Sequence, residues 1–61
     1  MSLKEYLNTL RIDSAEMLLQ NSQLDIAEIS LSLGFSDPNY FTVIFKKHTG
    51  ITPSAYRAKH K

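Results

Sequence analysis

Apolar residues recur along this chain at intervals of three and four positions, the spacing that places side chains on one face of an α-helix. The clearest run consists of Phe41, Ile44, Phe45 and His48. These residues stand at positions i, i+3, i+4 and i+7, so we predict that they form a buried stripe. No segment alternates apolar and polar residues with the period of two that is typical of a strand. The pattern therefore predicts an all-α chain.

Two capping boxes mark the starts of the first two predicted helices. Ser2 stands three residues before Glu5, so its hydroxyl can accept from the Glu5 backbone N–H while the Glu5 carboxylate reaches back. This helix should run to about Gln20, since no glycine or proline interrupts it. Asp25 and Glu28 form a second box of the same kind, which opens a short helix.

Glycine, serine and proline residues set the boundaries of two further helices. Gly34 is expected to end the second helix in the left-handed conformation that glycine adopts most readily. Ser36 is expected to cap the third helix, with Asp37 in its first turn, and Gly50 to close it. The Thr52–Pro53 pair starts a fourth helix, with the hydroxyl as cap and proline at the first helical position. The sequence thus predicts a small four-helix domain with a long N-terminal helix.

The first predicted helix has two apolar faces instead of one. At about 100° per residue, Ile12, Ala15 and Leu19 share one face. The other face holds Leu3, Tyr6, Leu7, Leu10 and Met17. The remaining helices of so short a chain can cover only one of these faces, so we expect the second face to lack a partner within the chain.

A weak internal repeat points the same way. Residues 1–6 and 51–56 share the order apolar residue, hydroxyl cap, three further residues and tyrosine. Six loosely matched positions also occur by chance. Together with the two-faced helix, the repeat leads us to expect that the chain is the latter half of a duplicated domain. Residues 1–21 would form a connecting helix and residues 25–61 a second folded unit.

Length and composition exclude several classes of protein. Sixty-one residues suffice for one small domain, and without cysteine its stability must come from packed side chains. His48 and His60 lack the spacing of metal ligands, and no nucleophile beside a base or pair of catalytic carboxylates indicates an enzyme. No apolar run approaches the roughly 20 residues that span a bilayer, and no signal peptide is evident. We therefore expect a cytoplasmic protein without a metal, a cofactor or a membrane partner.

The net charge of +1 hides a division along the chain. Residues 1–35 carry two basic and five acidic side chains, a net charge of −3. Residues 36–61 carry five basic and one acidic side chain, a net charge of +4. A basic face on a small domain favours a nucleic-acid partner, although a solvated surface explains the same charges equally well.

The second and third predicted helices, joined by residues 34–36, have the form of a homeodomain-like helix-turn-helix unit, whose second helix enters the DNA major groove. The outward positions of that helix, residues 36–49, are Asn39, Thr42, Val43, Lys46 and Lys47. The Asn39 amide can pair with adenine, and Thr42 and Val43 can touch a thymine methyl. Lys46 and Lys47 suit phosphates. Each residue also has an ordinary structural role, since lysines complement a helix dipole and Asn39 can act as a secondary cap.

Four segments in this order resemble the C-terminal part of the AraC/XylS-type DNA-binding domain, over essentially the whole chain. They are YLNTLRIDSAEMLL at 6–19, IAEI at 26–29, LGFSDPNYF at 33–41 and FKKHTGITPSAYR at 45–57. The resemblance implies a bacterial transcriptional regulator, usually an activator, whose partners are double-stranded DNA and, in the intact regulator, RNA polymerase. Domains of that family hold two helix-turn-helix units joined by a long helix, of which this chain would contain the joining helix and the second unit.

The resemblance also assigns roles to residues of the third helix. The base-reading positions of the family fall on Pro38, Asn39, Thr42 and Val43. A phosphate contact is implied at Lys46, and Ser36, Tyr40 and Lys47 are further candidates for contacts to the DNA backbone. Val43 departs from the family pattern, since relatives often carry Arg or Lys there, and this chain lacks that donor for guanine.

An interaction module is the main alternative to a DNA-binding unit. In that interpretation the apolar face formed by Leu3, Tyr6, Leu7 and Leu10 binds a partner or a second copy of the chain. The two alternatives differ in their response to salt, because phosphate contacts weaken steeply with added salt whereas apolar contacts hardly respond.

Overall fold

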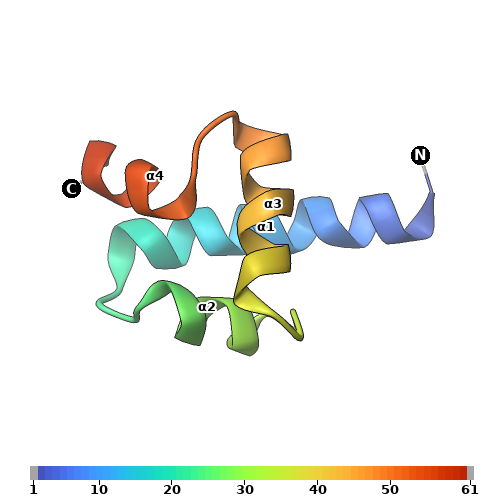
Figure 1. Ribbon diagram of the computed structural model, residues 1–61, viewed down its shortest axis with the longest axis horizontal. Helices are drawn as coiled ribbons and strands as arrows, with labels where there is room; N and C mark the ends of the chain where they lie inside the picture. The colour runs from blue at the N-terminus through green and yellow to red at the C-terminus, as the bar shows by residue number, and fades with distance from the viewer. Residues whose placement is uncertain (1, 61) are drawn as a thin grey trace.

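The computed structural model describes residues 2–60, so that Met1 and Lys61, and with Met1 the first position of the weak repeat, lie outside the described part. The elements in order are α1 (Leu3–Asn21), α2 (Ile26–Ser32), α3 (Pro38–Thr49) and α4 (Pro53–Lys59). Within residues 2–60 there is no strand, which confirms the predicted all-α class. Helix α1 packs against each of the other three helices. Figure 1 shows α3 crossing α1 steeply, with α2 and α4 on opposite sides of the C-terminal half of α1.

The caps of α1 and α2 lie where the sequence places them. The Glu5 backbone N–H donates to the Ser2 hydroxyl at 3.1 Å. In α2 both halves of the box form, because the Glu28 N–H donates to Asp25 Oδ1 at 2.8 Å and the Asp25 N–H donates to Glu28 Oε1 at 3.3 Å. In the first predicted box, among residues 2–60, the bond that the Ser2 hydroxyl accepts is present, whereas the return bond to the Glu5 carboxylate is absent. Helix α1 ends at Asn21, within one residue of the expected position.

The cap of α3 differs from the prediction, because Asp37 and not Ser36 caps the helix. Its carboxylate accepts from the Asn39 backbone N–H at 2.9 Å, and its own backbone is extended. Pro38 explains the difference: its ring disfavours the helical conformation in the residue before it, which leaves Asp37 outside the helix. The third helix therefore spans Pro38–Thr49, and not 36–49 as predicted. Gly50 closes it, as expected, and the structure adds that this glycine is left-handed.

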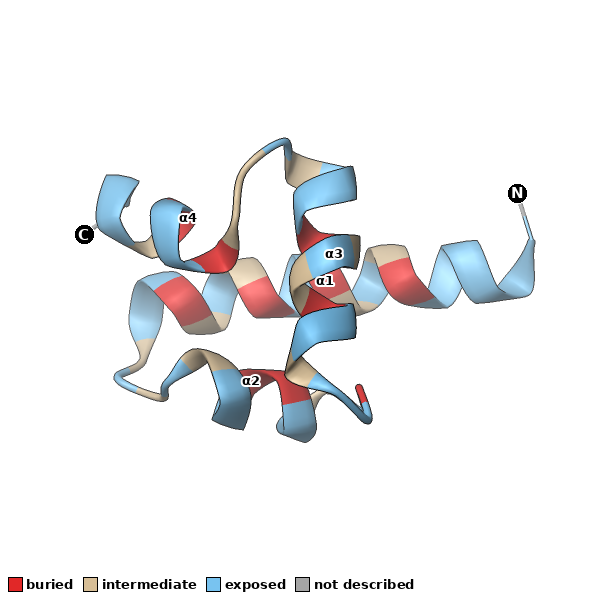
Figure 2. Ribbon diagram, viewed as in Figure 1, coloured by how far each residue is buried: buried red, intermediate tan, exposed pale blue. Residues whose placement is uncertain are grey.

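A column of aromatic rings holds the helices together. Phe41 and Phe45 have no exposed surface, and their ring centroids lie 5.8 Å apart. Phe35 continues the column at 5.1 Å from Phe41, and Tyr56 at 5.5 Å from Phe45. The column packs against four aliphatic residues of α1 and α2, namely Ile12, Ala15, Leu19 and Ile29. Figure 2 shows the buried segments where the helices meet.

His48 does not belong to the buried stripe, contrary to the sequence prediction. Ile44 is half-buried and His48 is exposed. The crossing explains this: only the middle of α3 lies on α1, and its last turn extends beyond the core (Figure 1). A stripe defined by periodicity alone does not show where the supporting helix ends.

The second apolar face of α1 is uncovered, as the sequence predicts. Leu3 is 84% exposed and Met17 is 66% exposed. Tyr6, Leu7 and Leu10 are also exposed, whereas Ile12, Ala15 and Leu19 are buried. These five exposed residues, from here on the open face of α1, lie away from the core that the chain builds for itself.

Helix α4 is attached to the C-terminal end of α1 by polar contacts. Thr52 caps α4, since its hydroxyl accepts from the Ala55 N–H at 3.2 Å. The Gln20 amide donates to the Tyr56 hydroxyl at 2.7 Å. Burial of the Tyr56 side chain raises the pKa of its phenol, although the Gln20 hydrogen bond acts in the opposite direction. Arg57 donates to the carbonyls of Leu19 at 3.2 Å and Ser22 at 3.3 Å.

We expect Arg57→Ala to lower the free energy of unfolding by about 2 kcal/mol, because two carbonyls at the end of α1 lose a charged donor. Urea denaturation followed by circular dichroism measures this change. Lys59→Ala is the control, since Lys59 is an exposed cation on the same helix. Equal stabilities of the two variants would show that the Arg57 contacts contribute nothing.

Ser30→Ala should stabilise the domain. Ser30 has no exposed surface, and its hydroxyl oxygen has no hydrogen-bond partner among the described residues. Removing a buried, unpaired hydroxyl should add about 1 kcal/mol, or about 5 °C in the Tm of a domain this small. Ser32→Ala is the matched control, because the exposed Ser32 donates to the Ile29 carbonyl at 2.9 Å. A lower Tm for Ser30→Ala in thermal denaturation would contradict the expectation.

Candidate nucleic-acid interface

The turn between α2 and α3 is built by two backbone hydrogen bonds around a glycine. Gly34 has φ +94°, the left-handed conformation predicted from the sequence. The Phe35 N–H donates to the Ser30 carbonyl and the Gly34 N–H to the Leu31 carbonyl, both at 3.1 Å. These two bonds form a Schellman motif, and they direct the Phe35 ring into the core. The chain then turns sharply, so that α3 crosses α2 in the manner of a helix-turn-helix unit.

Helix α3 has one buried face and one face open to solvent. Phe41 and Phe45 form the buried side. At about 100° per residue, the opposite side centres on Val43, which is 63% exposed. Asn39, Lys46 and Lys47 lie on the same open side and are exposed. The sequence prediction for the orientation of this helix is therefore confirmed.

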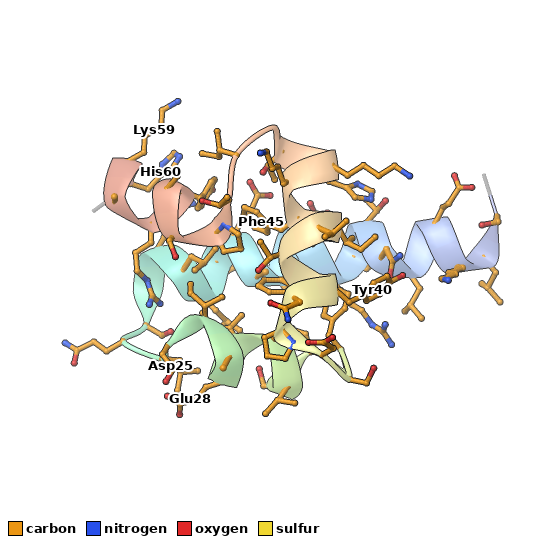
Figure 3. The ribbon with its side chains drawn as sticks, viewed as in Figure 1. Asp25, Glu28, Tyr40, Phe45, Lys59 and His60 are labelled. Atoms are coloured by element: carbon orange, nitrogen blue, oxygen red, sulfur yellow. The ribbon has the colours of Figure 1, made fainter. Side chains whose placement is uncertain are left out.

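The other predicted site residues lie at the edges of that open side. Pro38 and Thr42 are half-buried, and the Thr42 hydroxyl donates to the Pro38 carbonyl at 3.0 Å. Ser36 is exposed in the turn before α3. Tyr40 is 38% exposed, and its ring centroid lies 5.9 Å from that of Phe35. Figure 3 shows Tyr40 near the first turn of α3.

Two cations of α1 also lie at this end of α3, and the sequence analysis does not place them there. The Lys4 ammonium lies 5.9 Å from the centroid of the Tyr40 ring. The Arg11 guanidinium lies 5.3 Å from the centroid of the Phe35 ring, in the turn. The signal in the sequence is their separation of seven residues, which puts both on one flank of α1. The net negative charge of residues 1–35 draws attention away from this pair of cations.

Charges of both signs line a separate groove near α4. A cavity of about 340 Å³ lies between α1, the end of α3 and α4, and the carboxylates, histidines and lysine that line it are Asp13, Glu16, His48, Lys59 and His60. The His60 ring lies on that of Tyr56, with 4.2 Å between centroids. Figure 3 shows Lys59 and His60 far from Tyr40. Across residues 2–60, no three His, Cys, Asp or Glu side chains are grouped to hold a metal ion.

The helices of residues 2–60 are all too short or too polar to cross a membrane. Four features stand out on the surface of the described part: the open side of α3, the cations beside its first turn, the groove near α4 and the open face of α1.

Comparison with known proteins adds three findings. A family model described as a helix-turn-helix domain matches residues 1–59. The HTH-type transcriptional activator RhaR of Salmonella arizonae is 51% identical over 57 residues, which cover 93% of this chain and 20% of that protein. The RhaR protein of Salmonella paratyphi B matches to the same extent. The chain thus spans about a fifth of the length of the curated relatives it matches.

A solved structure shows the same fold. The C-terminal domain of the two-component response regulator yesN from Fusobacterium nucleatum superimposes with a TM-score of 0.90 at 40% sequence identity. The match covers 93% of this chain and 55% of that one. Helix-turn-helix transcription regulators such as these relatives are not enzymes, which agrees with the expectation from the sequence. On these grounds the chain belongs to the AraC/XylS-type family of helix-turn-helix transcription regulators.

Proposed function

We propose that this chain binds double-stranded DNA by placing α3, Pro38–Thr49, in the major groove. The observation that carries the proposal is the division of α3 into a buried side, Phe41 and Phe45, and an open side that bears Asn39, Val43 and two lysines. A helix fits the major groove only if its outward side is accessible along its length. The open side of α3 meets that condition.

The residues of the open side divide into two roles. Asn39 and Val43 stand in the first two turns, from which side chains of a recognition helix reach base edges, with Pro38 and Thr42 beside them. Lys46 and Lys47 stand in the last turn and bind phosphates. Ser36, just before the helix, and Tyr40, in its first turn, contribute hydroxyl groups to contacts with the DNA backbone.

The wider role follows from the relatives. RhaR is named as a transcriptional activator, and we infer that the protein containing this chain activates transcription in the bacterial cytoplasm and contacts RNA polymerase. Those activities belong to a protein of which this chain resembles about a fifth.

The open face of α1 supports a second element of the proposal. Large apolar side chains exposed along one stripe favour a contact with another apolar surface. The yesN domain is nearly twice the length of the matched part, which supports a two-unit domain in which residues 1–21 connect a further helical unit to residues 25–61. The alternative is a dimerisation or protein-interaction module that uses Leu3, Tyr6, Leu7 and Leu10.

Lys46→Ala should weaken binding to mixed-sequence duplexes at low salt. Each phosphate contact contributes about 0.9 to the slope of log affinity against log salt concentration. The variant should therefore lower that slope by about 1 in fluorescence anisotropy titrations. Lys59→Ala is the matched control, because it removes the same charge from α4, outside the open side of α3. If both variants lost the same affinity, the lysines would act only through net charge, and the proposed orientation would be wrong.

The open face of α1 should cause self-association of this chain at roughly millimolar concentration, where weak apolar contacts become populated. Leu10→Glu should abolish it, because a carboxylate in the middle of the stripe opposes burial. Leu31→Glu is the control, since Leu31 is 61% exposed on α2 and does not belong to that face. Sedimentation equilibrium measures both. A monomeric wild-type chain under these conditions would rule out self-association through this face.

A further inference from the structure

We infer that α3 selects A·T base pairs, through adenine at Asn39 and through the methyl group of thymine at Val43, about two base-pair steps apart. The inference rests on the proposed function and names the bases that the same surface would read. The inference follows from two side chains of the open side: Asn39 has a polar group without a partner in the hydrogen bonds of residues 2–60, and Val43 is apolar.

Asn39 offers an uncommitted amide on a fixed backbone. Its backbone N–H donates to the Asp37 carboxylate at 2.9 Å, which anchors the residue in the first turn of α3. The side chain is exposed, and its amide takes part in none of the hydrogen bonds found within residues 2–60. A carboxamide has one acceptor and one donor side by side, which match the N6 donor and N7 acceptor of adenine.

Val43 presents an apolar group at the centre of the open side. It is 63% exposed and lies opposite the buried Phe41 and Phe45. The methyl group of thymine is the one apolar group among the base edges of the major groove. A guanine or cytosine edge facing the Val43 side chain would lose hydrogen bonds to water without a replacement. The site therefore favours thymine and disfavours G·C pairs.

The rest of the first two turns offers no cationic side chain that could read guanine. These turns contain no arginine, the residue that most often reads guanine. The Thr42 hydroxyl, which lies beside Val43, already donates to the Pro38 carbonyl. Lys46 and Lys47 stand in the last turn of the helix. Among these positions, Asn39 and Val43 are exposed on the open side, whereas Pro38 and Thr42 are half-buried at its edge, so we assign the base selection to Asn39 and Val43.

The helix geometry sets the distance between the two bases. Residues i and i+4 lie one above the other on a helix, and four residues rise about 6 Å. Base pairs stack at about 3.4 Å, so side chains about 6 Å apart reach bases about two steps apart when the helix lies along the groove. Adenine and thymine are thus expected at this separation, on either strand.

The first test is selection of duplexes with a short randomised segment by the wild-type chain at low salt, followed by sequencing. We expect enrichment of adenine and thymine at two positions about two steps apart. Selection with Asn39→Ala should lose the adenine preference, and selection with Val43→Ala should lose the thymine preference. Both side chains are exposed, so neither change should alter the fold, which circular dichroism verifies.

The second test uses modified bases in the selected duplex. Replacing the selected thymine with uracil removes only the methyl group, and should weaken wild-type binding about fourfold, the effect of one buried methylene. Replacing the adenine with 7-deazaadenine removes the N7 acceptor, and should weaken binding roughly tenfold. Val43→Ala should lose most of the discrimination against uracil but keep that against 7-deazaadenine, whereas Asn39→Ala should show the reverse.

The outcomes separate this inference from the proposed function. Salt-dependent binding that is reduced by Lys46→Ala but shows no base preference, or prefers guanine and cytosine, would overturn the inference and leave DNA binding intact. Binding that depends on neither salt nor Lys46 would overturn both. If the wild-type and Val43→Ala chains showed the same ratio of affinities for the thymine and uracil duplexes, the role of Val43 alone would be overturned.

Discussion

Burial of Phe41 and Phe45 against α1 is the interaction on which the other features depend. These two rings fix the rotation of α3 about its own axis, because they have no exposed surface and contact the aromatic rings on either side of them. Once that rotation is set, the helical repeat determines which side chains face solvent. The open side of α3 is thus a consequence of core packing, and burying these rings stabilises the fold by several kcal/mol.

The backbone that leads into α3 supports the same arrangement. Gly34 and Phe35 end α2 and begin the turn, and Asp37 with Pro38 starts the next helix within a few residues. Such a short connection gives α3 little freedom to tilt relative to α2. Phe35 belongs to both the turn and the core, so the turn cannot open without exposing a large aromatic ring.

Much of this fold follows from local signals in the sequence. The capping residues Ser2, Asp25 and Thr52 and the two left-handed glycines act over a few residues, so their spacing in the chain is sufficient to predict them. The two faces of α1 also follow from periodicity. The cap at Asp37 does not follow from residue type alone, because Ser36 before it is also a good capping residue and only the restriction that Pro38 imposes on its neighbour distinguishes the two.

The remaining differences concern contacts between helices. Periodicity predicts a buried His48, although the residue is exposed, because periodicity describes a single helix and not the point at which a crossing helix leaves its support. Lys4 and Arg11 lie beside the rings of Tyr40 and Phe35 only because α1 crosses α3. Distances between segments far apart in sequence depend on the crossing of the helices, which no local pattern contains. The orientation of α3 was predictable because its amphipathic pattern is strong.

The surroundings of Gly34 have a consequence for how such a domain diversifies during evolution. A β-carbon at this position would lie 3.3 Å from Nη2 of Arg11, and the positive φ already disfavours any residue with a side chain. Substitution is therefore restricted where the chain turns. Positions such as 39 and 43, by contrast, carry exposed side chains and can change without disturbing the interior. Descendants of one ancestor can thus acquire new binding preferences while keeping the scaffold unchanged.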